Sequence, residues 1–472
     1  MRTLEITLAI ILFIRILLPL LNIVKWNKWV SLAAFAVMIL QLSFEGYRWQ
    51  MIPLYLLTLW FSAVAVWRLR HPISHASGSP GKKTAIIFVE AIIFLLFLTL
   101  PLVLPIPRTP EPTGNNNVGT IKLTLIDHAR QEIYAKEPGG YRIINVQIWY
   151  PAELDPDAKP ALWLDNMEVM APALAAKLNL PSFFLDHIKY AQTHALTNAP
   201  LLNSGSKYPL LLFSHGWGGF KSQNTYQVEE LASHGYIVAA PDHTYGAIAS
   251  VFPDGSIALN NPDALPVDAE MPENEFLSAA QILGDQWAGD LGFVIDSLEN
   301  PGVNYQLDVL GQNIDFTRVG VLGHSTGGGA AIEFCATDAR CQAALGMDPY
   351  MDPVSKQVQT QNFNKPYMAM FSESWAIEPG RNNDIFKLFF NNVKEDRFDF
   401  YIQETKHYDF TDMPAFSPLA PYLGLKGTLN GEQVSKIINA YTLAFFDRYF
   451  RGDSGTILDK PSEKYPEMIY LP

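Results

Sequence analysis

Cysteine is scarce in this chain of 472 residues, which has only Cys335 and Cys341. There is no Cys-x-x-Cys pair and no Cys/His cluster with zinc-ligand spacing, so the sequence predicts neither a structural metal nor a cofactor. Two cysteines six residues apart can form a small disulfide loop in an oxidising compartment. The alternative is a pair of free thiols, one of them buried.

Positive charge is also in deficit, because 34 Lys and Arg residues face 47 Asp and Glu residues and the net charge is −13. A nucleic-acid partner calls for a basic stripe or patch, and the sequence has none. Low-complexity tracts and internal repeats are missing as well. The sequence therefore predicts no nucleic-acid partner and a solvated acidic surface.

Long apolar runs are missing after Pro107, but four of them precede it, at residues 3–24, 29–46, 52–68 and 84–107. Each is close to the ~20 residues that a helix needs to cross a bilayer. The first lacks a small-residue cleavage site and is followed by more apolar stretches, so it is interpreted as a retained helix. Residues 1–107 are expected to form a membrane region of about four helices. Three spans plus an interfacial helix are the alternative, because two stretches are short.

The Lys and Arg residues in the short loops predict an orientation for these helices. With four spans, one side carries six positive charges and the other carries Arg2, Arg48 and Arg108; the six are Lys25, Lys28, Arg68, Arg70, Lys82 and Lys83. The more positive side is expected in the cytoplasm. The rest of the chain is then expected on the outer face of a plasma or inner membrane, whereas three spans would reverse one end.

Arg15 and Glu90 interrupt the apolar stretches. A lone charge within a bilayer costs several kcal/mol on some scales, so the two side chains are expected to pair. A polar functional site within the bundle is one interpretation, and packing specificity or a snorkelling Arg15 is the preferred one.

A Pro-, Gly- and Asn-rich run at 108–117 predicts a linker, and alternating strands and helices follow over 118–472. The pattern predicts a mostly parallel sheet with helices on both faces. Residues 153–205 and 243–274 are expected to be insertions. The predicted strands are 120–126, 142–150, 208–214, 235–240, 317–322, 342–347, 366–371 and 397–403; the predicted helices are 224–234, 275–298, 327–337, 382–393 and 431–450.

The motif Gly323-His324-Ser325-Thr326-Gly327 follows an apolar strand and precedes a helix. Gly-x-Ser-x-Gly in this context is the nucleophile elbow of the α/β-hydrolase fold, whose tight turn lifts the serine hydroxyl out of the sheet. A β-carbon at Gly323 or Gly327 would collide across the turn. The sequence therefore predicts Ser325 as a nucleophile.

The order of a catalytic triad in this fold is Ser, then Asp or Glu, then His. Of ten histidines only His407 follows Ser325, so it is the one candidate base. Asp348 ends a predicted strand and is the preferred acid, with Asp352 and Glu373 as alternatives.

An oxyanion hole needs two preorganised N–H donors. Thr326, directly after the nucleophile, is the first candidate. Trp217, in the loop His215-Gly216-Trp217-Gly218-Gly219 after the strand PLLLFSHG, is the second. His215 is expected to support this loop, and His234, His243 and His324 are interpreted as structural.

Six segments of the chain resemble the platelet-activating factor acetylhydrolase family, in the same order over most of 118–450. They are 207–220 (KYPLLLFSHGWGGF), 230–243 (ELASHGYIVAAPDH), 319–328 (VGVLGHSTGG), 344–353 (ALGMDPYMDP), 365–374 (KPYMAMFSES) and 406–412 (KHYDFTD). In that resemblance Ser325, Asp348 and His407 match the triad, and Trp217 and Thr326 match the oxyanion positions. Trp217 replaces a smaller aliphatic residue, and the acidic insertion at 243–274 is a second departure.

The resemblance implies hydrolysis of short or oxidised sn-2 acyl chains of phospholipids, through an acyl-enzyme and without a metal. Three alternatives remain: a carboxylesterase or polyester hydrolase with small ester substrates, an acyltransferase, and an inactive hydrolase domain that serves a membrane complex.

Overall fold

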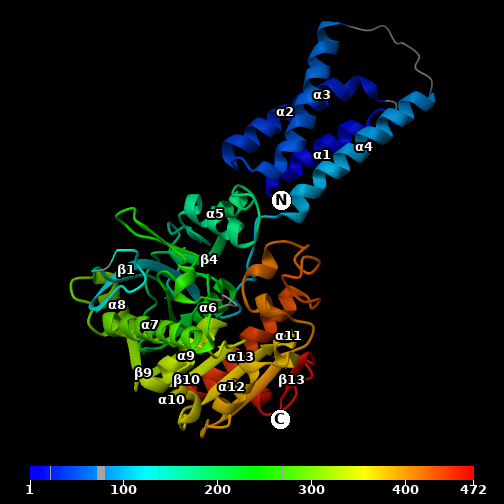
Figure 1. The fold of residues 1–472 in the computed structure, drawn as a ribbon. Helices are drawn as coiled ribbons and strands as arrows, with labels where there is room; N and C mark the ends of the chain where they lie inside the picture. The colour runs from blue at the N-terminus through cyan, green and yellow to red at the C-terminus, as the bar shows by residue number, and fades with distance from the viewer. Residues whose placement is uncertain (22, 72–79, 138, 267–270, 472) are drawn as a thin grey trace. The chain divides into compact units, whose positions relative to one another are not determined.

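The computed structural model describes residues 1–21, 23–71, 80–137, 139–266 and 271–471. Part of the predicted insertion at 243–274 and one residue of the first apolar stretch lie outside these ranges. The chain divides into two compact units, one of Met1–Pro107 with Phe416–Leu419 and one of Arg108–Ala415 with Ala420–Pro472. Each unit is described by itself (Figure 1).

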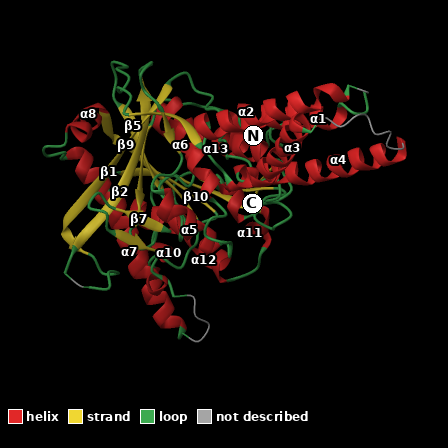
Figure 2. Cartoon of the chain, turned by 90° about the horizontal axis from the view of Figure 1, so that it is seen from above, coloured by secondary structure: helices red, strands yellow, loops and turns green. Residues whose placement is uncertain are grey.

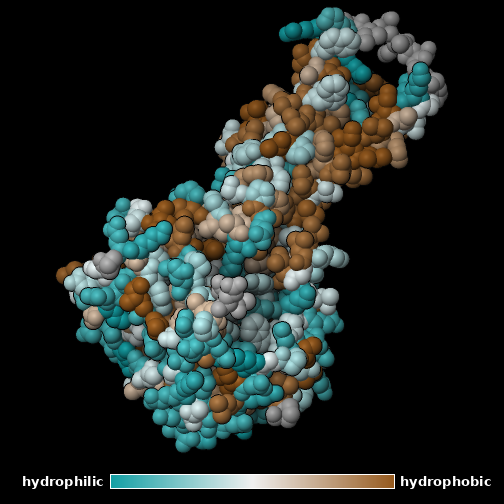
Figure 3. Space-filling view, viewed as in Figure 1, coloured by the Kyte–Doolittle hydropathy of each residue, from teal (hydrophilic) through white to brown (hydrophobic). Residues whose placement is uncertain are grey.

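The N-terminal unit contains four α-helices among its described residues: α1 (Thr3–Leu17), α2 (Asn27–Phe44), α3 (Ile52–Arg70) and α4 (Pro80–Val103). Leu8, Leu12 and Ile16 of α1 recur every four residues and are fully buried in the bundle core. The opposite faces carry exposed Ile, Leu, Phe and Trp, and Figure 3 shows apolar residues gathered over these helices.

The first apolar stretch is shorter as a helix than the sequence predicts. Among the described residues, three helices are long and apolar enough to cross a membrane: Val24–Phe44, Trp49–Arg70 and Gly81–Val103. The prediction of one helix over 3–24 is wrong, because α1 ends at Leu17. Leu18 precedes Pro19, and the proline ring disfavours helical backbone at the residue before it. At ~1.5 Å per residue, α1 is roughly 22 Å long, against a hydrocarbon core of about 30 Å.

Ion pairs join α1 to α4 and to the segment between α2 and α3. Arg15 of α1 pairs with Glu90 of α4, as predicted. A second pair joins Glu5 of α1 to Arg48 at 2.8 Å, with both side chains fully buried. Arg48 also donates to the Leu104 carbonyl at 3.0 Å. The buried charges of Glu5, Arg15 and Arg48 are thus paired, which offsets much of the cost of burying them.

The second unit is built on an eleven-stranded sheet, within the described residues, in the order β13-β12-β11-β10-β9-β5-β6-β2-β1-β4-β3. The neighbours from β6 through β5, β9, β10 and β11 to β12 are parallel, and β2 joins β6 antiparallel. Figure 2 shows the strands with helices packed around them. The strands are β1 (Asn117–Gln131), β2 (Tyr141–Ala152), β3 (Pro160–Leu162), β4 (Gln192–Thr197), β5 (Tyr208–Ser214), β6 (Ile237–Asp242), β9 (Ile314–His324), β10 (Cys341–Met347), β11 (Tyr367–Ser372), β12 (Arg397–Ile402) and β13 (Met468–Tyr470).

Each face of this sheet buries its own apolar core. On β5, Leu210 and Leu212 point to one core and Leu211 and Phe213 to the other, which is the period-two alternation of a strand covered on both faces. The first core contains α7 (Glu273–Glu299), α8 (Tyr305–Asn313), α9 (Thr326–Thr337), α10 (Lys356–Thr360) and α12 (Arg381–Phe390); the second contains α6 (Thr225–Ser233) and α13 (Gly431–Arg451). The α/β-hydrolase architecture predicted from the sequence is confirmed.

All eight predicted strands and five predicted helices of this unit exist, with ends within a few residues of those expected. The elements that were not predicted are short or lie in the insertions. They are β3, β4, β13, α8, α10, α5 (Met167–Lys177), α11 (Glu373–Ile377) and the hairpin of β7 (Ala249–Val251) and β8 (Ile257–Leu259).

The predicted linker is bound to the rest of the second unit over its second half. The Thr113 N–H donates to Glu230 at 2.7 Å, and the N–H groups of Gly114 and Asn116 donate to Ser233, both acceptors being on α6. A side chain at Gly114 would collide with the Ser233 backbone. Residues 113–116 of the predicted linker therefore form a strap that is anchored to α6.

A buried carboxyl on α6 predicts a pH-dependent stability. Glu229 is fully buried, accepts a hydrogen bond from the Ala195 N–H at 2.7 Å, and has its pKa raised to about 8 by burial. Because this pKa exceeds the ordinary value of 4.5, the folded state binds the extra proton between about pH 4.5 and 8. The free energy of unfolding should therefore fall as pH rises through this window, by roughly 5 kcal/mol at 1.36 kcal/mol per unit.

Glu229→Gln should flatten this profile, so that the variant gains stability over the wild type between pH 5 and pH 8. Thermal unfolding of both proteins at several pH values measures the difference. Glu432→Gln, which changes an exposed carboxylate on α13, is the control and should run parallel to the wild type. Parallel curves for Glu229→Gln would contradict the assignment.

Candidate active site

Ser325 lies in the turn between β9 and α9, near the middle of the sheet. Its backbone has φ 57° and ψ −124°, a strained conformation for a residue with a side chain. The Ser325 N–H donates to the Met347 carbonyl of β10 at 2.9 Å, which holds the turn against the sheet. A β-carbon at Gly323 would strike the backbone of Gly327, and one at Gly327 would strike the carbonyls at the end of β5. The predicted collision across the turn is thus confirmed for Gly323, whereas the obstacle at Gly327 is the end of β5.

His407 and Asp348 are hydrogen-bonded to each other, at 2.9 Å between Nδ1 and Oδ2. Asp348 follows β10 and is fully buried, and it also accepts from the Ser372 N–H and hydroxyl, both at 2.7 Å. Of the alternative acids, Asp352 accepts from the Tyr350 hydroxyl at 2.7 Å and Glu373 accepts from the Glu404 N–H at 2.8 Å. The structure thus brings Asp348 to His407 and engages the other two carboxylates elsewhere.

The loop that carries His407 is held from two sides. The Trp375 indole of α11 stacks on the His407 ring, with centroids 4.3 Å apart. Five residues after His407, the buried Asp412 carboxylate accepts from the N–H groups of Thr225 and Tyr226 at the start of α6. Burial raises the pKa of Asp412 to about 7, although these hydrogen bonds favour its ionised form. The helix N-terminus therefore fixes the segment after His407.

The two predicted oxyanion donors come from different elements. Thr326 is the first residue of α9, and the first four N–H groups of a helix have no partner within the helix. Trp217 lies in the loop after β5, which passes close to Ser325, since a β-carbon at Gly216 would lie 3.3 Å from Ser325 Cβ. Lys177 of α5 donates to the Trp217 carbonyl at 2.6 Å, so the insertion helps to hold this loop.

Gln223 connects the loop of Gly216, the elbow at His324 and, through His324, the loop of His407. No sequence motif indicated this role. Its Oε1 accepts from the Gly216 N–H at 3.1 Å, and its Nε2 lies 3.2 Å from Nδ1 of His324. Nε2 of His324 in turn lies 3.1 Å from the His407 carbonyl. Burial and the nearby His407 hold the pKa of His324 well below its usual value, so the ring is neutral. The neutral ring accepts from Gln223 and donates to His407, which sets the loops relative to the elbow.

Cys335 of α9 and Cys341 of β10 are joined in a disulfide. The bond closes a loop at the end of the helix that starts beside Ser325. Among the described residues, no three His, Cys, Asp or Glu side chains gather as a metal site would require.

Comparison with known proteins identifies the family. The family of platelet-activating factor acetylhydrolase, isoform II, matches residues 107–454, about three quarters of the chain. The chain belongs to this family. A platelet-activating factor acetylhydrolase from Cavia porcellus is 28% identical over 320 residues, covering 64% of this chain and 72% of the relative. A probable 1-alkyl-2-acetylglycerophosphocholine esterase from Arthroderma benhamiae is 23% identical over 287 residues, covering 56% of this chain and 66% of the relative.

Among solved structures, a ferulic acid esterase from Streptomyces cinnamoneus superposes with a TM-score of 0.63 at 27% identity, covering 78% of this chain and all of that one. Membership in the acetylhydrolase family and these esterase relatives make the chain a carboxylic ester hydrolase. The family match begins at residue 107, so the four N-terminal helices lie outside it.

Trp217, one of the two departures from the family pattern, is half-buried beside the site. Its ring stacks on Trp287 of α7, with centroids 6.3 Å apart. A second indole, Trp375, lies against His407. Two indole rings, those of Trp217 and Trp375, therefore lie in the neighbourhood of the candidate site.

Proposed function

We propose that this chain is a membrane-anchored serine esterase in which Ser325, His407 and Asp348 form the catalytic triad. The observation that carries the proposal is the hydrogen bond between His407 Nδ1 and the buried Asp348 carboxylate, on loops that flank a serine in an elbow turn. An aspartate bonded to Nδ1 fixes the tautomer in which Nε2 is free to accept a proton.

In the proposed mechanism, His407 takes the proton of Ser325 as the serine oxygen attacks an ester carbonyl. The N–H groups of Trp217 and Thr326 stabilise the tetrahedral oxyanion. His407 then gives its proton to the leaving alcohol or lysolipid, and a water activated by the same imidazole hydrolyses the acyl-enzyme. The Ser372 N–H and hydroxyl hold the Asp348 carboxylate against His407, where it stabilises the imidazolium that forms in each half-reaction.

The proposed substrates are phospholipids with a short or oxidised sn-2 acyl chain. Family membership supports this class, and so do the relatives named as hydrolases of platelet-activating factor or of 1-alkyl-2-acetylglycerophosphocholine. An apolar N-terminal unit favours a lipid substrate, because it would hold the enzyme at the surface where phospholipids reside.

A second candidate is an esterase that acts on small soluble esters with an aromatic acyl group. The solved relative titled a ferulic acid esterase supports it, together with the two indoles of Trp217 and Trp375 near the site. A flat acyl group would stack on such surfaces.

Membrane anchoring and an outward-facing catalytic unit are part of the proposal. If Val24–Phe44, Trp49–Arg70 and Gly81–Val103 cross, the cytoplasmic side still carries Lys25, Lys28 and the Arg and Lys residues around 68–83. The domain after α4 therefore stays outside with three or with four spans. An extracytoplasmic location would also suit the Cys335–Cys341 disulfide.

The test is hydrolysis by the full chain in detergent or nanodiscs. We expect a phospholipid with an sn-2 acetyl group to be cleaved with a higher kcat/KM than p-nitrophenyl acetate or methyl cinnamate. The same phospholipid with an sn-2 octanoyl group should be cleaved more slowly than the acetyl form. A preference for the cinnamate ester would favour the second candidate. Transfer of the acyl group to an added alcohol, in preference to water, would identify an acyltransferase instead.

A further inference from the structure

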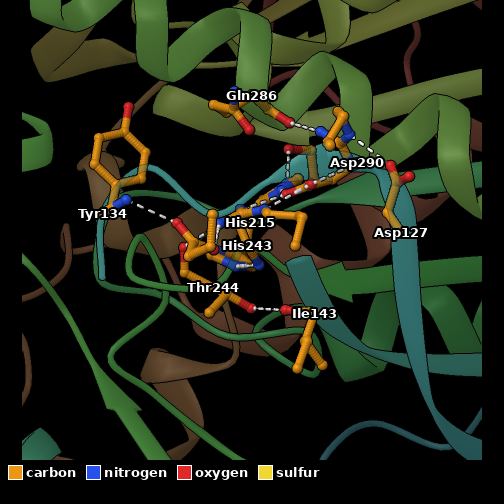
Figure 4. Close-up of polar contacts among 12 residues, drawn as sticks. Asp127, Tyr134, Ile143, His215, His243, Thr244, Gln286 and Asp290 are labelled. Atoms are coloured by element: carbon orange, nitrogen blue, oxygen red, sulfur yellow. Dashed lines mark hydrogen bonds and ion pairs between the residues drawn. The ribbon is translucent and has the colours of Figure 1, made fainter. Parts of the chain in front are cut away.

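A cluster of buried polar residues lies behind the loop that carries Trp217, and the proposed triad does not use it. Its centre consists of His215, His243 and Asp290, with Ser214 beside them, and all four are fully buried. Figure 4 shows His215 and His243 next to each other, with Asp290 beyond them. Such a network is costly unless every member has a partner, so its contacts are informative.

The contacts determine where the proton of His215 lies. The backbone N–H of His243 points at Nε2 of His215 over 3.0 Å. An N–H group can only donate, so Nε2 is the unprotonated acceptor and the ring proton is on Nδ1. Nδ1 lies 2.8 Å from the carbonyl oxygen of Gly216, to which it therefore donates.

That carbonyl oxygen belongs to the same planar peptide as the Trp217 N–H. The two groups point in opposite directions in a trans peptide. The Gly216 oxygen is fixed by His215 on one side and accepts a second hydrogen bond from the Gly219 N–H at 2.8 Å. Fixing the oxygen fixes the direction of the Trp217 N–H, the donor proposed for the oxyanion.

His243 is itself held by groups deeper in the unit. Its Nδ1 donates to Asp290 at 2.9 Å, and the Ser214 hydroxyl lies 2.9 Å from its Nε2. Asp290 also accepts two hydrogen bonds from Arg142, at 3.0 and 2.7 Å. The ring of Trp287 stacks on His243, with centroids 4.1 Å apart. These contacts leave the backbone of His243, and with it His215, little freedom to move.

We propose that His215 is a positioning residue that orients the Gly216–Trp217 peptide toward the developing oxyanion, and that the Ser214–His243–Asp290 cluster holds it there. The inference rests on the proposed function, because it assigns the Trp217 N–H a role in acyl transfer. His215 acts through the peptide and does not touch the substrate.

Two substitutions separate the two hydrogen bonds of His215. In His215→Asn the side-chain amide nitrogen takes the place of Nδ1, so the bond to Gly216 is kept and the acceptor for the His243 N–H is lost. In His215→Gln the terminal amide takes the place of Nε2, so the acceptor is kept and the donor to Gly216 is lost. The measurements are kcat and KM for p-nitrophenyl acetate, the melting temperature, and the inhibition constant of a trifluoromethyl ketone that mimics the tetrahedral intermediate.

We expect His215→Gln to lower kcat by about 10- to 100-fold, somewhat less than the 100- to 1000-fold loss on removing a donor outright, with KM within about twofold. The trifluoromethyl ketone should bind more weakly by a similar factor. His215→Asn should keep kcat within about fivefold of the wild type but melt at a lower temperature, because it leaves a buried N–H unpaired. A merely structural role would lower kcat and melting temperature together.

Equal kcat values for the wild type and both variants would overturn the proposal, as would losses of kcat that follow melting temperature. Ser325→Ala, assayed in parallel, distinguishes this failure from a failure of the proposed function. If Ser325→Ala is inactive and His215→Gln is fully active, only the role of His215 is wrong. If Ser325→Ala retains activity, the triad itself is wrong.

Discussion

Replacing Ser325 by alanine is expected to lower kcat for acetyl esters by about 10⁶-fold, to the level that binding and the oxyanion donors supply alone. The Ser325 hydroxyl oxygen is the atom that would form the acyl-enzyme, and alanine lacks it. Alanine has the same β-carbon as serine, so the strained backbone at φ 57° is no worse in the variant. Folding should be unchanged, and the measurement is kcat with melting temperature as the companion.

The matched control is Ser297→Ala on α7, where the serine hydroxyl donates to the Phe293 carbonyl of its own helix. This variant should retain the activity of the wild type. A fluorophosphonate probe should label the wild type and Ser297→Ala with one equivalent and leave Ser325→Ala unlabelled. Residual activity above a thousandth of the wild type in Ser325→Ala would require a different nucleophile.

The central sheet could be predicted because its strands are buried on both faces. A strand such as β5, with Leu210 to Phe213 all fully buried, is a continuous apolar run that stands out in any sequence. The three-residue strands β3 and β13 carry no such signal. They form because a neighbouring strand offers an open edge, β4 for the first and β12 for the second. Pro19 indicates the end of α1, but the apolar residues on both sides of it favour a longer helix.

Candidate site residues were predictable where chain order or a local motif constrains them. Ser325 lies in a motif, and His407 is the one histidine that follows it. Gln223 and Trp375 have neither signal, because their contacts with His324 and His407 arise only when separate loops meet above the sheet. The strap at 113–116 was missed for the same reason, since its partners on α6 are more than a hundred residues away.

If Asp348 is the acid of the proposed triad, Asp348→Asn should lower kcat by about 10⁴-fold while leaving the fold intact. Oδ1 of Asp348 accepts from the Ser372 N–H, so the asparagine oxygen is expected to stay there. The amide nitrogen then takes the place of Oδ2 and faces His407 Nδ1. Two donors cannot share this contact, so His407 must move its proton to Nε2, and that nitrogen can no longer take the proton of Ser325.

Asp352→Asn is the matched control, because it changes the same residue type four positions later, beside Tyr350 and Arg381. It should keep kcat within a few-fold of the wild type. The imidazole nitrogen shifts of His407, measured by NMR on selectively labelled protein, should change from the Nδ1–H to the Nε2–H form in Asp348→Asn alone. If Asp348→Asn keeps its activity and Asp352→Asn loses it, the acid is Asp352, and the hydrogen bond between Asp348 and His407 only shapes the loop.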